Sequence, residues 1–151
     1  MRRVVTGWNE AGEPAILFDG KATTFDFGFA ASAEIWTTET VPADFRQRND
    51  PTAGEFAVEP PIGGSICRIV SYQPGATVDI HSTETVDYVI VISGEFTMIV
   101  DDREIVLSAG DVVVQQATPH GWANRGDEPC VVAAILLTAE GASDEGRLQW
   151  P

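Results

Sequence analysis

Short runs of β-branched and aromatic residues recur along the chain, and Gly, Pro or Asp separates most runs from the next. Such runs predict strands, and hardly any stretch has the sustained period that marks an amphipathic helix. The one helical candidate is a single turn at 43–47, after Pro42. The pattern therefore predicts an all-β sandwich or barrel, with strands at 15–18, 33–37, 65–72, 77–80, 86–92, 95–100, 104–107, 111–115, 121–124 and 130–137.

The length of 151 residues suits one domain with one core. No internal repeat and no linker divides the sequence. Residues 49–64 predict a surface loop that precedes the main sheet. We expect a core barrel over roughly 63–138 and an N-terminal extension, 1–62, with extra strands packed on it.

The net charge of -14 and the pI of about 4.2 argue against nucleic acid and anionic membranes as partners. Arg2 and Arg3 are not followed by an apolar leader core, and the longest apolar run, 131–137, is too short to span a bilayer. We expect a cytoplasmic protein in which Cys67 and Cys130 are reduced, buried thiols.

The only two histidines lie in two strand-like segments. In "GATVDIHSTETVDYVIVISGEF", which begins at Gly75, His81 and Thr83 can share one face of the sheet, and Asp87 can face them from the next strand. In "GDVVVQQATPHGWANRG", alternation places His120, Trp122 and Asn124 on one face. A metal ion could lie between His81, Thr83 and Asp87 of the first segment.

Both segments resemble the two conserved motifs of the cupin superfamily. The first cupin motif, G-x5-H-x-H-x3-4-E-x6-G, is matched without a gap at its fixed positions by Gly75, His81, Thr83, Asp87 and Gly94. The second, G-x5-P-x-G-x2-H-x3-N, is matched one residue short by Gly110, His120 and Asn124, with Gln116 and Thr118 at the Pro and Gly positions. "HSTETVDY" and "VVQQATPHGWAN" are more similar to a branch of small single-domain cupins. The resemblance implies an RmlC-like β-barrel or jelly roll, a metal on inward side chains, and a homodimer formed through edge strands.

The usual cupin ligands are three imidazoles and a glutamate, but Thr83 and Asp87 replace two of them here. The resemblance therefore implies a reduced metal site of His81, Asp87 and His120, suited to Fe, Mn or Zn. We expect Asp87 and His120 to serve catalysis as well. A cupin that has lost a ligand and no longer binds metal is the competing interpretation.

Other side chains are candidates for binding a substrate. Arg68 is mid-strand and could anchor an anion, although an outward-facing charge is the more common arrangement. Trp122 could line a pocket or pack in the core, and either Gln115 or Gln116 should face outward. Glu84 is an alternative carboxylate ligand in a turn, and Tyr88 should point away from Asp87. Thr83, Phe96, Met98 and Trp36 complete the expected pocket.

A divalent ion with open positions supports decarboxylation, dehydration, isomerisation or cyclisation, and iron could also bind O₂. No serine triad motif or phosphate-binding loop suggests another chemistry. We therefore expect a metal-dependent lyase or isomerase acting on a small aromatic or polyketide-like organic acid. A metal-dependent dioxygenase and a non-catalytic cupin that binds a small ligand are the alternatives.

Overall fold

The computed structural model describes residues 1–139, and every regular element in that range is a β-strand. The all-β fold is thus confirmed. Every strand expected from the sequence is present, and β1 and β3 are additional. The strands are β1 (Arg2–Trp8), β2 (Pro14–Lys21), β3 (Thr23–Asp26), β4 (Ala30–Thr38), β5 (Ser65–Tyr72), β6 (Thr77–His81), β7 (Thr85–Ser93), β8 (Glu95–Val100), β9 (Arg103–Ser108), β10 (Val112–Gln116), β11 (His120–Ala123) and β12 (Cys130–Thr138).

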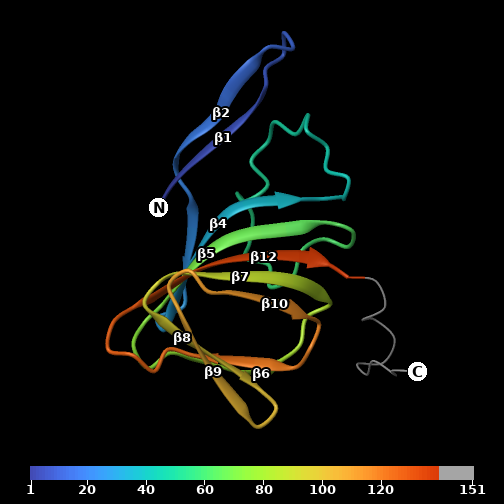
Figure 1. Ribbon diagram of the computed structural model, residues 1–151. Helices are drawn as coiled ribbons and strands as arrows, with labels where there is room; N and C mark the ends of the chain where they lie inside the picture. The colour runs from blue at the N-terminus through green and yellow to red at the C-terminus, as the bar shows by residue number, and fades with distance from the viewer. Residues whose placement is uncertain (140–151) are drawn as a thin grey trace, which may run out of the picture.

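Two antiparallel sheets face each other and form the barrel (Figure 1). The larger sheet has the strand order β10-β7-β12-β5-β4-β3, and the smaller has the order β6-β11-β8-β9. Consecutive strands therefore often lie in opposite sheets, as in a jelly roll. This crossing brings the β6 and β11 strands of one sheet opposite β5 and β7 of the other.

The N-terminal extension contributes to the barrel sheet. Its strands β3 and β4 pair with each other, and β4 pairs with β5 along the edge of the larger sheet. The β1–β2 hairpin forms a separate two-stranded sheet that stands away from the barrel (Figure 1).

A buried ion pair ties this hairpin to the loop that follows β4. Arg3 is 7% exposed, and its guanidinium donates to the carboxylate of Asp50 and, at 2.7 Å, to the hydroxyl of Thr52. The Arg3 guanidinium lowers the pKa of Asp50 to about 2. This contact links two segments that are far apart in the sequence.

The expected helical turn at 43–47 is wrong. Residues 45–46 form an isolated turn in which the Asp44 carboxylate accepts hydrogen bonds from the backbone N–H and the side chain of Arg46. A segment this short cannot offset the cost of helix nucleation. Within residues 1–139 there is no helix long and apolar enough to cross a bilayer.

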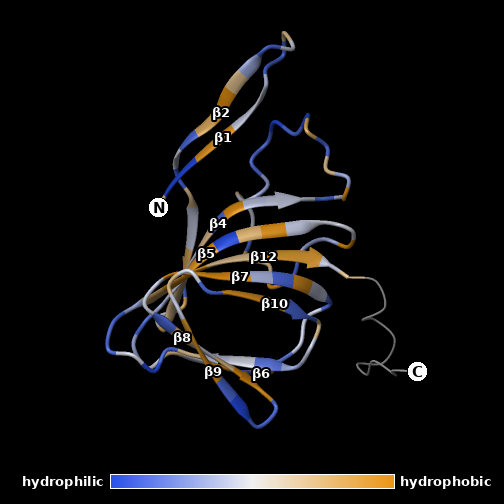
Figure 2. Ribbon diagram, viewed as in Figure 1, coloured by the Kyte–Doolittle hydropathy of each residue, from blue (hydrophilic) through white to orange (hydrophobic). Residues whose placement is uncertain are grey.

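The core lies between the two sheets, where one row of each strand faces inward. Hydrophobic residues concentrate on the central strands β5, β12 and β7 (Figure 2). Phe96 is stacked between Tyr72 and Trp122, with ring centroids 4.6 and 4.9 Å away. Two charged residues, Arg68 and Asp87, occupy inward positions among these apolar rows and are buried.

We expect Asp50→Asn to lower the free energy of unfolding by about 2 kcal/mol at pH 7, because the folded-state pKa of Asp50 is depressed by Arg3. A depressed carboxyl pKa stabilises the fold above the unfolded-state pKa of about 4, and this stabilisation disappears as the pH falls through 4 toward 2. Urea unfolding of both proteins at several pH values measures the difference. Asp19→Asn is the matched control, because its ion pair with Arg2 is exposed and should contribute little. An Asp50→Asn effect that is unchanged at low pH would contradict the assignment.

Candidate functional site

The two histidines meet across neighbouring strands of the smaller sheet. His81 ends β6 and His120 begins β11, and the two residues are directly paired in the antiparallel register. Their ring centroids are 4.5 Å apart. His120 is buried, whereas His81 is partly exposed. The pairing brings together the only imidazoles of the chain.

Each imidazole ring is held in place by a hydrogen bond at its own Nδ1. Nδ1 of His81 lies 2.8 Å from the carbonyl oxygen of Asp79, and Nδ1 of His120 lies 2.8 Å from that of Thr118. A carbonyl only accepts hydrogen bonds, so each Nδ1 carries the proton and donates it. Each Nε2 of a neutral ring is then left with a free lone pair, which is the arrangement that metal-binding histidines require.

The Thr118 carbonyl has a second donor, the side-chain amide of Gln115, at 2.9 Å. Gln115 therefore positions His120 indirectly. The connection between β10 and β11 also includes Ala117, whose φ of 50° is left-handed and whose N–H donates to the carbonyl of Thr85. Burial lowers the pKa of His120, which favours the neutral ring.

Asp87 lies on β7, in the opposite sheet. It is 6% exposed, and its Oδ1 is buried without a hydrogen-bond partner in the described structure. Burial raises the pKa of Asp87, against the opposing effects of the Thr85 hydroxyl and the charges of Arg68 and His81. The Thr83 hydroxyl, 2.7 Å from that of Thr85, also lies at this end of the barrel.

A cavity of about 340 Å³ joins these groups inside the barrel. This volume lies in the range of small-molecule sites. Most of its wall is apolar, and the polar side chains on it include those of the histidines, Thr83, Asp87 and Arg68. The remaining lining residues are Phe27, Phe29, Ala30, Ser32, Phe56, Val58, Val70, Tyr72, Val78, Val89, Phe96, Trp122, Val132, Ala134 and Leu136.

The structure brings most of the expected site residues to this cavity: His81, Thr83, Asp87, His120, Arg68, Phe96 and Trp122 line it. Arg68 is buried and faces the cavity, so the outward-facing alternative is wrong. Of the two glutamines, Gln115 is buried and Gln116 is exposed. Tyr88 and Glu84 are exposed and do not line the cavity.

Three residues expected on the pocket wall do not line it. Met98 packs in the core cluster, and Gln115 is buried behind the wall. Trp36 lies on the outer side, because a β-bulge between Glu34 and Trp36 shifts the pairing with β5 by one residue. Such a shift moves all following side chains to the opposite face.

The cavity has an aromatic rim that was not predicted from the sequence. Phe27, Phe29 and Phe56 of the N-terminal extension line the cavity, and the ring centroids of Phe27 and Phe56 are 4.9 Å apart. The run "FDFGF" at 25–29, in which aromatic residues alternate with a polar or small residue, is the sequence signal of this wall.

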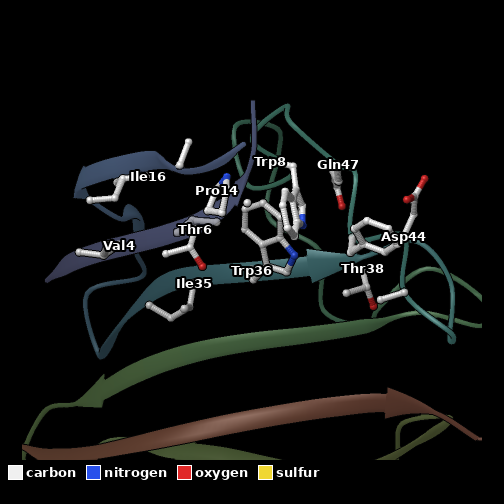
Figure 3. Close-up of a pocket in the computed structure, with 15 residues that line it drawn as sticks. Val4, Thr6, Trp8, Pro14, Ile16, Ile35, Trp36, Thr38, Asp44 and Gln47 are labelled. Carbon is white, nitrogen blue, oxygen red and sulfur yellow. The ribbon is translucent and has the colours of Figure 1, made fainter. Parts of the chain in front are cut away.

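A second, larger hollow lies between the β1–β2 hairpin and β4. It has a volume of about 840 Å³, and Figure 3 shows the indoles of Trp8 and Trp36 within it. Asp44 is its only charged lining residue, and neither histidine reaches it. The chemically equipped site is therefore the barrel cavity.

The donor chemistry of the barrel cavity fits a divalent ion in part. Two neutral imidazoles with free Nε2 atoms are strong ligands for Fe, Mn or Zn. The buried Oδ1 of Asp87 lacks a partner on the same cavity. However, no three His, Cys, Asp or Glu side chains within residues 1–139 form a group that could hold a metal ion. Of the expected triad, His81 and His120 therefore lie together, and the carboxylate of Asp87 lies apart from them.

Comparison with known proteins agrees with this architecture. A cupin domain matches residues 68–136. The chain is 33% identical to the cupin-domain-containing oxidoreductase srdD of Neurospora crassa, over 97% of this chain and 82% of that protein. It is 40% identical to the phomopsin biosynthesis cluster protein D of Diaporthe leptostromiformis, over 60% of this chain but only about half, 51%, of that protein.

The solved structure of an RmlC-like cupin from Shewanella frigidimarina superposes with a TM-score of 0.53 at 17% identity, covering 80% of this chain and 86% of that one. This likeness supports the barrel fold alone. The match to the Neurospora protein over nearly the whole chain shows the family, and the cupin-domain match at 68–136 agrees with it: the chain belongs to the cupin family.

Proposed function

We propose that this cupin is a metal-dependent enzyme that converts a small organic molecule in the barrel cavity. The observation that carries the proposal is the cross-strand pair of His81 and His120, whose Nδ1 atoms are both held by backbone carbonyls. A histidine with a purely structural role needs no second imidazole beside it. In this pair each Nδ1 is bound to a carbonyl, and each Nε2 remains available to bind an ion.

His81 and His120 would hold the ion through Nε2, and Asp87 is the carboxylate that could complete the set by moving toward them. A bound divalent ion would polarise a substrate oxygen and stabilise negative charge on it. Because only two ligands are adjacent, the other positions would be open to water or substrate. This openness suits a lyase or isomerase reaction such as decarboxylation, dehydration or cyclisation.

The chain's own side chains supply the rest of the site. The stacked rings of Phe96 and Trp122 form an apolar wall that excludes water. Where it stays apart from the ion, the Asp87 carboxyl, with its raised pKa, would be suited to hold a proton and return it to the substrate. Thr83 offers a hydroxyl to a water or substrate oxygen on the same cavity.

An oxidoreductase is the second candidate, because the Neurospora relative that matches nearly the whole chain bears that name. The same histidine pair would then hold a redox-active ion such as iron. Oxygen dependence separates this candidate from a lyase or isomerase.

We expect the purified chain, without a histidine tag, to bind about one divalent ion, and His81→Ala and His120→Ala each to weaken binding at least tenfold, as loss of a ligand should. Asp87→Asn should weaken binding less, because its carboxylate is not adjacent to the histidine pair. Elemental analysis and metal-induced shifts in melting temperature, with Fe(II), Mn(II) and Zn(II), measure this. Glu84→Gln is the matched control, since it removes a nearby exposed carboxylate. An unmodified chain that binds none of the three ions would refute the metal proposal and favour a non-catalytic ligand-binding cupin.

Gln115→Leu should weaken metal affinity by about tenfold while the fold survives, because Gln115 orients His120 only through the shared Thr118 carbonyl. Leu retains the bulk of Gln115, and the lost Oε1 has no hydrogen-bond partner in the described structure. NMR of the imidazole nitrogens should show the His120 tautomer becoming mixed. The neighbouring exposed Gln116→Leu should change neither quantity. If Gln115→Leu and Gln116→Leu had the same metal affinity and the same His120 tautomer, Gln115 would not position His120.

A further inference from the structure

Arg68 places a guanidinium on the wall of an otherwise mainly apolar cavity. It lies on β5 and is 7% exposed, and it pairs with the small residue Ala134 of β12. The Phe56 ring covers one face of the guanidinium, with its centroid 4.7 Å from Cζ. Because Ala134 also lines the cavity, little side-chain volume lies beside the guanidinium on that strand.

The protein satisfies only part of this guanidinium. Nη2 donates to the Ala57 carbonyl at 2.7 Å and lies 3.4 Å from a carboxylate oxygen of Glu34. Nε is enclosed and has no hydrogen-bond partner within residues 1–139. A buried donor without a partner is costly, especially on a charged group. Nη1, in contrast, is not enclosed and has no hydrogen-bond partner within residues 1–139, so an oxygen atom of a ligand in the cavity could accept from it.

The charges around Arg68 determine whether a neutral or a negatively charged ligand oxygen is favoured there. Glu34 pairs with Arg68 across β4 and β5, is 6% exposed, and has its other carboxylate oxygen held by the Ser32 hydroxyl. The Arg68 and Glu34 charges therefore cancel within the wall. Glu34 itself does not line the cavity, and Asp87 is the acidic side chain that does. A ligand carboxylate would thus add an uncompensated negative charge whether or not Asp87 is ionised, and burying such a charge is unfavourable.

We infer that the cavity accepts a neutral carbonyl compound, an aldehyde, ketone or ester with a flat unsaturated body, and discriminates against the matching carboxylate. The carbonyl oxygen accepts a hydrogen bond from Arg68, and the apolar body packs along the wall that contains Phe96 and Trp122. This inference revises the expectation of an organic acid anchored by Arg68. It rests on the proposed function only in placing the ligand in the barrel cavity.

The test uses three probes of similar size with different head groups: benzylideneacetone as the ketone, cinnamate as the carboxylate and cinnamylamine as the cation. Calorimetric titration is performed on the full chain after chelation of metal, so that no ion contributes to head-group preference. The ketone should bind at least about tenfold more tightly than either cinnamate or cinnamylamine. Absence of ketone binding up to its solubility limit, or an equal or greater affinity for either charged probe, overturns the inference.

Glu34→Gln gives the sharpest result, because it removes the compensating charge and leaves Arg68 positive. Gln keeps the oxygen that accepts from Ser32, so the fold should survive. Cinnamate should then bind about tenfold more tightly than to the unmodified chain, with little change for the ketone. The exposed Glu39→Gln is the matched control and should leave all three affinities unchanged. No gain in cinnamate affinity for Glu34→Gln contradicts the inference.

The double variant Glu34→Gln/Arg68→Met removes the pair together, so that no buried carboxylate is left unpaired. It should lose about tenfold in ketone affinity relative to Glu34→Gln alone, and also the gain for cinnamate. An unchanged ketone affinity in this variant, with the native melting transition retained, would show that Arg68 does not receive the carbonyl. Failure of metal binding with these preferences intact would refute the proposed enzyme but not the ligand class, and the reverse outcome would refute only the ligand class.

Discussion

Burial of polar groups between the two sheets is the constraint on which the structure of this site depends. A barrel strand alternates inward and outward side chains, and the inward rows must be largely apolar for the sheets to pack. Arg68 and Asp87 interrupt those rows and are nevertheless buried. The protein compensates them incompletely, with Glu34 and the Ala57 carbonyl for Arg68 and a Thr85 hydroxyl for Asp87. Within residues 1–139, the buried side-chain atoms without a hydrogen-bond partner belong to residues on or next to the cavity wall: Arg68 Nε, Asp87 Oδ1 and Gln115 Oε1. Such local inconsistency in an otherwise consistent fold is typical of a functional site.

The local strand pattern predicted the barrel, and the resemblance to the two cupin motifs implied that His81 and His120 belong to one site. Strands were recognisable from short β-branched runs, and the motif spacing implied that His81 and His120 lie together, as their register now shows. Trp36 could not be placed correctly in this way. Its face depends on the bulge in β4, which exchanges inward and outward positions after Glu34. The partner of Arg68, Glu34, was not predicted for a different reason: β4 belongs to the extension, which was expected only to pack on the barrel. Strand β3 is only four residues long and offered too weak a pattern to be recognised.

The N-terminal extension has a larger part in the site than its position in the sequence suggests. It supplies Glu34, the carbonyl of Ala57 and the phenylalanines of the cavity rim. Phe56 connects these features, since it contacts the rings of Phe25 and Phe27 and also covers the Arg68 guanidinium. The cupin motifs contribute the histidines and Asp87, whereas the extension sets the electrostatic environment of Arg68. Cupins that share the motifs but differ in this extension would therefore share donor groups without sharing a ligand preference.

The overall acidity of the chain and the composition of the cavity favour the same ligands. At a net charge of -14 the surface repels anions at long range, although salt screens this effect over about 8 to 10 Å. Behind the cavity wall Arg68 is matched by Glu34, and Asp87 is the acidic side chain that lines the cavity. A neutral molecule meets no electrostatic barrier at either stage. A divalent cation would be attracted at long range, and the paired imidazoles could bind it through Nε2. The proposed cation and the proposed neutral carbonyl ligand would together be the combination that a Lewis-acid reaction at a carbonyl oxygen requires.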